Sequence, residues 1–302
     1  MKKTIGLLLL CLAIPAIDVR AERPVMTGQP SGNILATGSR RIVIMDPGGK
    51  VLWQHRGDNV SDCWMLANGN VLFADNRITE VDPTTNKVVF SYQPKVMKGG
   101  GTYGCQPLEN GNTLVGENST GRILELNREG KVAFELQLPL YQKGNHHNLR
   151  MVRKLNNGNY LVCHSGKHRV REYTPKGEIV FEVQVNNIAF AAIRLDNGNT
   201  LVAHLDQITE FSPAGKTVWQ FSNTDIAGLK ISSMCGVHVL PNGNLAIGVY
   251  SAYKKGGEAG LFEITRDKKL VWCYSNPKSD GSMMSIQMLD PEGKPLPGRT
   301  VR

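Results

Sequence analysis

The chain has 302 residues, a mass of 33.2 kDa and a formal net charge of +9, which allows one large domain or two ordinary ones. A basic protein attracts anions such as sulfate esters, acidic glycans or lipid head groups, although the charge can also serve solubility alone. No block of five like charges and no basic helix is visible, so nucleic acid is not an expected partner.

Residues 1–21, "MKKTIGLLLLCLAIPAIDVRA", have the pattern of a secretory signal peptide: two lysines, an apolar run from Ile5 to Ile14, and small or aliphatic residues near Ala21. A lipid anchor at Cys11 is not favoured, because Leu10 precedes it where a small residue is normally needed. No other apolar run approaches the roughly 18 residues of a membrane span. We expect residues 22–302 to form a soluble, monomeric, periplasmic or secreted protein with a net charge of +7.

The cysteines beyond this segment are odd in number and widely spaced, with no Cys-x-x-Cys pair: Cys63, Cys105, Cys163, Cys235 and Cys273. This set fits neither a disulfide scaffold nor a zinc ribbon. We expect most of them to be small buried hydrophobic residues.

One phrase recurs six times along the chain, as "SGNILATG", "NGNVLFAD", "NGNTLVGE", "NGNYLVCH", "NGNTLVAH" and "NGNLAIGV". Successive glycines of this phrase are 37 to 47 residues apart, the length of four short strands with their turns. This spacing is typical of a β-propeller, in which each repeat forms one blade.

Each repeat predicts the same order of elements. An alternating strand leads into Asn-Gly, expected to form a type I′ hairpin, and a second apolar strand leaves it. A third strand follows, as in "RITEVD" and "QITEFS", and a turn rich in Pro, Gly and Lys leads to a fourth. The fourth strands carry an aromatic residue at one shared position: Trp53, Phe90, Phe134, Phe181, Trp219 and Trp272. A single four-stranded sheet cannot cover its own faces, so we interpret these aromatics as packing between blades.

The two ends of the repeat array are complementary. The first repeat begins at its second strand, near Asn33, and residues 285–293, "SIQMLDPEG", resemble an orphan first strand. Their pairing would complete the ring and remove an exposed sheet edge. The predicted fold is therefore all-β, a six-bladed β-propeller of four-stranded antiparallel blades in one domain, with a seventh blade as the alternative.

The variable loops of a propeller are the expected place for function. The Asn-Gly and Pro-x-Gly-Lys turns share one face and hardly vary, whereas the opposite face carries long, varied loops. Five of the seven histidines fall between residues 146 and 204, in the third to fifth blades: His146, His147, His164, His168 and His204.

Four consecutive second strands present a polar residue at one shared position: Asp75, Glu117, His164 and His204. Such a set could bind a divalent cation or supply a paired acid and base. Alternatively, these side chains lie between blades as satisfied polar residues.

The predicted first strands offer a second set of polar residues, two positions before a shared leucine. Trp64, Gln106, Arg153 and His238 occupy this position, with Arg150 close by. An arginine can hold a sulfate, phosphate or carboxylate with two parallel hydrogen bonds. Alternatively, the arginines pair with acidic neighbours such as Glu109. The ligand-binding candidates are Trp64, Gln106, Arg150, His164, His168 and His204.

The pattern L-x-N-G-N-x-L-V followed by E-x-x-P-x-G-K-x-V-W-x-F, clearest in residues 195–221, resembles the repeats of bacterial propellers related to arylsulfotransferases and the pyrroloquinoline-quinone-like group. The resemblance implies sulfuryl transfer through a histidine, His146 or His147, with His238, Arg153 or His164 stabilising the developing charge. The sequence is shorter than those enzymes. The quinone-like branch implies a redox cofactor or a protein-docking scaffold, and because quinoprotein dehydrogenases are much longer, no quinone cofactor is expected.

No serine-hydrolase elbow, phosphate loop or zinc-protease motif is present. We therefore expect an exported binding module whose variable face, in blades three to five, binds an anionic small molecule, a glycan or an exported protein. Histidine-mediated sulfuryl transfer and a metal-assisted hydrolase or lyase are the alternatives.

Overall fold

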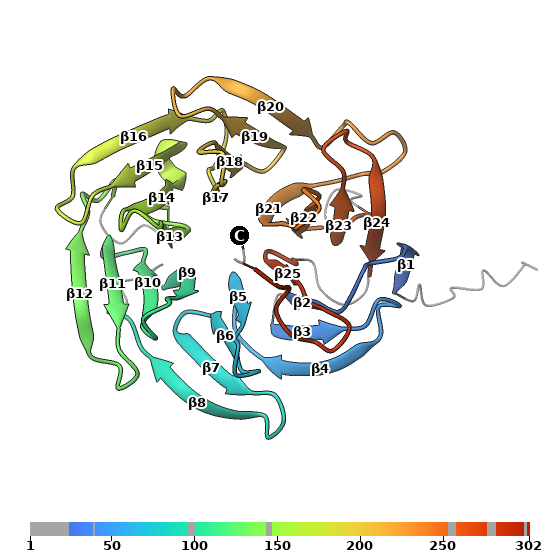
Figure 1. Cartoon of the computed structure of the whole chain (residues 1–302), viewed down its shortest axis with the longest axis horizontal. Helices are drawn as coiled ribbons and strands as arrows, with labels where there is room; N and C mark the ends of the chain where they lie inside the picture. The colour runs from blue at the N-terminus through green and yellow to red at the C-terminus, as the bar shows by residue number, and fades with distance from the viewer. Residues whose placement is uncertain are drawn as a thin grey trace, which may run out of the picture.

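The computed structural model describes residues 24–38, 40–95, 101–142, 147–252, 258–276, 282–298 and 301–302. Six antiparallel sheets surround one central axis, and the described regular structure is almost entirely strand (Figure 1). The predicted six-bladed propeller is confirmed. In the described part of the chain, no helix has the length and hydropathy needed to cross a bilayer.

Each blade is a sheet whose strands run in order from the axis outward. Blade one contains β25 (Ile286–Met288), β2 (Ile34–Thr37), β3 (Arg41–Met45) and β4 (Val51–Arg56). Blade two contains β5 (Asp62–Met65), β6 (Val71–Ala74), β7 (Ile78–Asp82) and β8 (Lys87–Tyr92). Blade three contains β9 (Thr102–Pro107), β10 (Thr113–Glu117), β11 (Arg122–Leu126) and β12 (Val132–Gln137).

The second half of the ring repeats this arrangement. Blade four contains β13 (Val152–Lys154), β14 (Tyr160–His164), β15 (Arg169–Tyr173) and β16 (Ile179–Gln184), with a 3-10 turn, η1 (Ser165–Lys167), after β14. Blade five contains β17 (Ala191–Arg194), β18 (Thr200–Ala203), β19 (Gln207–Phe211) and β20 (Thr217–Ser222). Blade six contains β21 (Ser233–Val239), β22 (Leu245–Tyr250), β23 (Leu261–Ile264), β24 (Leu270–Ser275) and β1 (Val25–Gly28).

The ring closes in blade one, as the sequence predicts. The late strand β25 pairs with β2, and Gln287 lies opposite Leu35. Blade six also has a strand that the repeat pattern does not predict, because β1 pairs with the outer edge of β24. A Cβ at Gly28 would lie 2.2 Å from the Val271 carbonyl oxygen, so only glycine permits this approach.

The hairpin turns differ from the predicted type I′ geometry. In blade two, the Leu66 carbonyl accepts a hydrogen bond from the Gly69 N–H (3.0 Å), and the Leu66 N–H donates to Asn70 (2.8 Å). Gly69 has a φ of +86°, but the preceding Asn68 is not among the residues with positive φ. The prediction of type I′ was therefore wrong. The loop is a three-residue hairpin connection, made of a type I turn followed by a left-handed glycine.

The outer-strand aromatics belong to a repeated tie between blades. In blade five, Trp219 lies opposite Glu210, whose carboxylate accepts a hydrogen bond from the Asn199 amide (2.6 Å). Arg266 of blade six binds the same carboxylate and lies 4.1 Å from the Trp219 ring. Glu80 and Glu172 form the same kind of tie. These polar residues are thus part of the fold.

All five predicted cysteines are buried thiols without a disulfide partner. Burial raises their pKa values, that of Cys63 to about 11 and those of Cys163 and Cys273 to about 12. They are small packing residues, as the sequence predicts.

Candidate functional site: the axial ends of the inner strands

The innermost strands surround the axis. Gln106, predicted to bind a ligand, and His238, predicted to stabilise charge in catalysis, each bond to the next inner strand. Gln106 Oε1 accepts the Lys154 N–H (2.8 Å), and His238 Nδ1 accepts the Met288 N–H (3.0 Å). Burial lowers the pKa of His238 to about 3, so its imidazole is neutral. Both side chains therefore hold adjacent blades together.

Trp64 and Arg153 also have partners within the protein. The Trp64 indole N–H donates to the Cys105 carbonyl (2.7 Å). Arg153 forms a buried ion pair with Asp62 through Nη1–Oδ2 (2.9 Å) and donates from Nη2 to Oδ1 (3.3 Å). Arg153 therefore pairs with an acidic residue, which was the alternative to ligand binding, and that residue is Asp62 rather than Glu109.

Arg150 has a different environment from Arg153. Its side chain is only 8% exposed, and its guanidinium carbon lies 4.2 Å from the Tyr103 ring centroid and 4.5 Å from that of Phe190. Nε makes one long hydrogen bond to Ser165 Oγ (3.4 Å), and the two terminal nitrogens make none within the described residues. No described Asp or Glu pairs with this cation. Burial lowers its pKa below the ordinary value, although it stays charged at neutral pH.

The residues around Arg150 come from different blades and lie at the starts of their inner strands. Phe190, Cys235 and Met284 form one apolar cluster at the starts of three inner strands. These strand starts are the ends opposite the glycine turns, which places the cluster on the face with variable loops. Tyr103 is held there by the Ser61 hydroxyl, which donates to its carbonyl (3.0 Å). The loop-face end of the axis is thus an apolar and aromatic ring containing one buried cation.

This geometry suits an oxyanion. The guanidinium carbon of Arg150 lies over two aromatic rings, and the terminal nitrogens make no hydrogen bond within the described residues. Their N–H groups, which lie in one plane, are therefore left for a ligand. A carboxylate, sulfate or phosphate group binds the edge of a guanidinium with two hydrogen bonds. The low local dielectric strengthens that interaction relative to one in water.

Two of the candidate histidines, His164 and His204, bond to neighbours that are not histidines. His164 is buried between the Asn148 carbonyl, 2.9 Å from Nδ1, and the Tyr173 hydroxyl, 2.8 Å from Nε2, and burial lowers its pKa to about 4. His204 Nε2 contacts Thr209 Oγ1 at 2.8 Å, and burial lowers its pKa too. Neither imidazole is hydrogen-bonded to another histidine.

The other histidines lie in the loop that leads into blade four and in the loop after β14. His168 follows η1 in a left-handed conformation with a φ of +53°. The His147 carbonyl accepts the Gly166 N–H (2.9 Å), which fixes its backbone beside η1. His146 lies outside the described residues. The nucleophile that the family resemblance implies stays a prediction.

The proposed metal-binding ring is not assembled from its four residues. Glu117 forms a buried ion pair with Arg122 (2.8 Å) and also accepts hydrogen bonds from Tyr92 (2.9 Å) and Thr120 (2.7 Å). Asp75 lies in blade two, where burial raises its pKa to about 6. Across the described ranges, no three His, Cys, Asp or Glu side chains gather closely enough to hold a metal ion.

A cavity of about 510 Å³ opens on the opposite, turn-bearing face between blades five and six. Its walls include Leu195, Leu240, Leu296 and the Glu210–Arg266 pair. Because that pair is one of the repeated ties between blades, its polar groups already have a structural role. No pattern in the sequence indicated this cavity.

Sequence reasoning identified Arg150 but missed its aromatic neighbours. Tyr103, Arg150 and Phe190 each lie five residues before the shared leucine of their first strand. The shared position, five residues before the leucine, predicts that the three side chains lie near one another, as the position two residues before it does for Gln106 and Arg153. Asp62 lies at an offset of four and would have been found in the same way.

No family model matches the sequence, and no curated protein matches it. Among solved structures, a protein of unknown function from Bacteroides caccae is 23% identical, with a TM-score of 0.76, over 86% of this chain and 98% of its own. A streptogramin B lyase is 14% identical, with a TM-score of 0.58, over 89% of this chain and 93% of its own. The WD40 propeller domain of Doa1 is 14% identical, with a TM-score of 0.54, over 72% and 71%.

At these identities, the comparisons show the fold alone: the chain is a β-propeller. They do not confirm the resemblance to arylsulfotransferases or to the quinone-like group. Propellers are a general scaffold for binding, and the specific ligand has to be argued from the residues of this chain.

Proposed function

We propose that this protein is an exported binding module that holds an anionic ligand at the loop-face end of its axis. The observation that carries the proposal is Arg150, a buried guanidinium that lies over two aromatic rings and has no carboxylate partner among the described residues. Burying a cation is unfavourable unless it is paired, so a site that keeps one unpaired is suited to an anion supplied from outside.

The surroundings of Arg150 favour an anion that also carries an apolar group. Phe190, Met284 and Cys235, which are all buried, form an apolar environment beside the cation. An aromatic or aliphatic carboxylate, or a sulfate or phosphate ester with such a body, fits both features, whereas a small inorganic ion fits only the charge. The predicted signal peptide at residues 1–21 supports an extracytoplasmic ligand.

Calorimetric titration with benzoate and inorganic sulfate tests the proposal. Wild-type protein is expected to bind benzoate more tightly than sulfate, and Arg150→Met to lose about 30-fold or more in benzoate affinity, corresponding to the roughly 2 kcal/mol of a charge-assisted hydrogen-bonded pair. Arg150→Lys keeps the charge but lacks the planar pair of donors, so we expect intermediate affinity.

Arg169→Met is the matched control, because Arg169 belongs to the same blade but pairs with Glu182 at the surface. The affinity of the Arg169→Met variant for benzoate should equal that of the wild type. Equal binding by wild type and Arg150→Met, or no binding of either anion by wild type, would overturn the proposal.

A further inference from the structure

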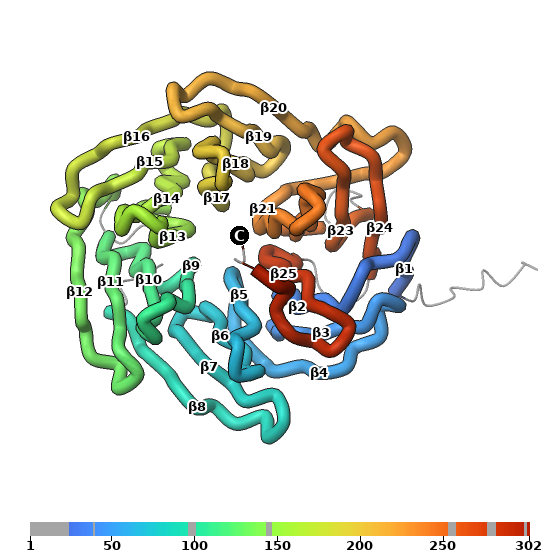
Figure 2. The backbone as a smooth tube through the Cα atoms, in the orientation of Figure 1, coloured from blue at the N-terminus to red at the C-terminus, as the bar shows by residue number. Residues whose placement is uncertain are grey.

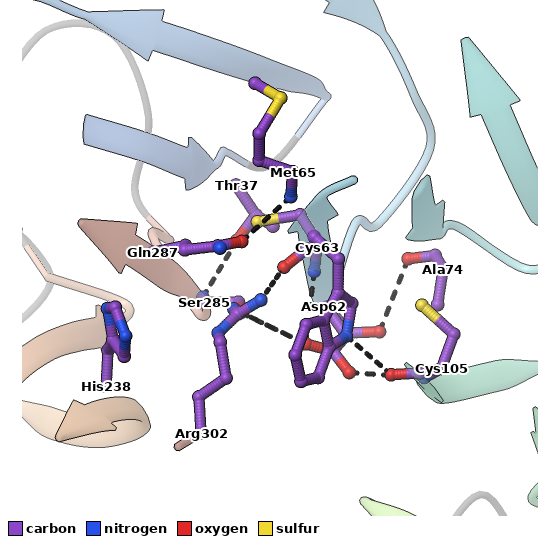
Figure 3. A network of polar contacts seen from close by, with 12 residues as sticks. Thr37, Asp62, Cys63, Met65, Ala74, Cys105, His238, Ser285, Gln287 and Arg302 are labelled. Atoms are coloured by element: carbon purple, nitrogen blue, oxygen red, sulfur yellow. Dashed lines mark hydrogen bonds and ion pairs between the residues drawn. The ribbon is translucent and has the colours of Figure 1, made fainter. Parts of the chain in front are cut away.

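A second arginine, Arg302, reaches the axis from the turn-bearing face. Figure 2 shows the C-terminal end of the chain at the centre of the ring, and the Val301 carbonyl accepts the Val239 N–H at the end of β21 that leads into its glycine turn. The Arg302 side chain is 2% exposed. Its Nη1 donates to the Cys63 carbonyl, and its Nη2 donates to Ser285 Oγ (2.5 Å) and lies 3.6 Å from Asp62 Oδ1 (Figure 3).

The residues that surround this guanidinium form a built site. Its carbon lies 4.6 Å from the Trp64 ring centroid, so one flat face is covered by an aromatic ring. Asp62 is fully buried and is oriented by the N–H groups of Cys63 (3.1 Å) and Cys105 (3.2 Å). The inner strands of the other blades have Gly104, Met151, Ala191, Gly236 and Ser285 at this position. The carboxylate is therefore particular to blade two and does not belong to the repeat.

The residue before Arg302 compensates for an irregularity in the ring. In blades one, three and six, the side chains of Gln287, Gln106 and His238 accept the N–H of the next inner strand. Blade five has Ile193 at this position, which offers no acceptor. The Val301 carbonyl takes its place and accepts the Val239 N–H (2.9 Å).

We propose that Asp62, Trp64, Ser285 and the Cys63 carbonyl form a guanidinium-binding site on the axis, and that the chain's own Arg302 is its ligand. A guanidinium fits because it is flat enough to stack on the indole and presents donors in one plane toward three separate acceptors. An ammonium group cannot satisfy all of these contacts at once. The occupied site ties blades one and two to the chain segment that pairs with blade six.

This proposal is independent of anion binding at Arg150, and chemical rescue tests it. Arg302→Ala is expected to lower the melting temperature by about 5 °C, because Asp62 loses one buried cation and the indole face is exposed. Millimolar methylguanidinium chloride should then raise the melting temperature of Arg302→Ala saturably. It should leave the wild type unchanged, since Arg302 already fills the site.

Two controls separate a specific site from a general salt effect. Methylammonium chloride should not rescue Arg302→Ala, and methylguanidinium should not rescue the double variant with Asp62→Asn. Should Arg302→Ala fail to fold alone, its refolding yield with methylguanidinium, compared with that with methylammonium, replaces the melting temperature as the readout, with the same expected rescue. Equal rescue by methylammonium, rescue without Asp62, or wild-type stability of Arg302→Ala would overturn the proposal.

Discussion

Replacement of Arg150 by methionine should stabilise the ligand-free protein, although the same change removes the proposed anion contact. Arg150 is 8% exposed and has no carboxylate partner among the described residues, and removing a charge from water costs several kcal/mol even in real proteins. The two aromatic contacts, at 4.2 and 4.5 Å, each return about 1 to 2 kcal/mol, and the long hydrogen bond to Ser165 about 1 kcal/mol or less.

Methionine retains most of the hydrocarbon volume and makes favourable contacts with aromatic rings. It leaves no orphaned group, because the Ser165 hydroxyl still donates to the Ala189 carbonyl (2.8 Å). We therefore expect Arg150→Met to be more stable by about 1 to 2 kcal/mol, a rise of about 3 to 6 °C in melting temperature.

Calorimetry and urea denaturation in a chloride buffer measure this difference. Adding saturating benzoate should reverse the order, because only the wild type gains stability from ligand binding. If Arg150→Met is less stable than the wild type without ligand, the arginine is a structural cation and the reasoning fails.

Three further predictions concern groups that shape the fold. Glu117→Gln should lower the free energy of unfolding by about 3 kcal/mol at pH 7, because Arg122 loses its buried carboxylate. Although burial opposes it, hydrogen bonds from Arg122 and Thr120 lower the pKa of Glu117, so this stability is present above pH 4.5 and is lost as the pH falls further. Urea titrations should therefore show a smaller difference between wild type and Glu117→Gln at pH 3.5 than at pH 7. Burial raises the pKa of Asp75 to about 6, so its folded form favours the proton and the carboxylate destabilises the protein above pH 6. Asp75→Asn should therefore stabilise by about 1 kcal/mol at pH 8, after allowance for solvent screening, and show no gain near pH 4; a constant difference would contradict this. Gly236→Ala should destabilise by about 2 kcal/mol because its Cβ would lie 2.5 Å from the Met284 carbonyl oxygen. Thermal melts should show a smaller loss in Gly243→Ala, where no atom lies within 4 Å and the cost comes from the left-handed φ of +84° alone.

The course of the chain around the ring could be predicted in detail because it depends on local patterns. The spacing of the Asn-Gly turns indicates the number of blades, and the orphan strand at residues 285–293 indicates how the ring closes. The Asn-Gly pairs predicted that the chain reverses direction between two strands, but not the type of turn. Asn-Gly is compatible with both type I′ and the observed type I turn with a left-handed glycine.

The candidate site could be predicted only in part. Arg150 was identified from its residue type and its place on the variable face, but the histidines around it looked equally suitable. Burial decided between them: His164 and His204 bond to neighbours within their own blade, whereas Arg150 keeps its terminal donors unused by the described residues. No sequence pattern reports which polar group finds an internal partner.

The sequence by itself determined the blade, its repetition and the direction in which each strand runs, because these follow from hydrophobic alternation and turn chemistry over a few residues. Only the tertiary structure decided which side chains meet at the axis. Tyr103, Arg150 and Phe190 come from three blades, and Asp62 meets Arg302 across 240 residues of chain. Contacts of this kind depend on the closure of the ring, which brings the starts of six distant strands to one place.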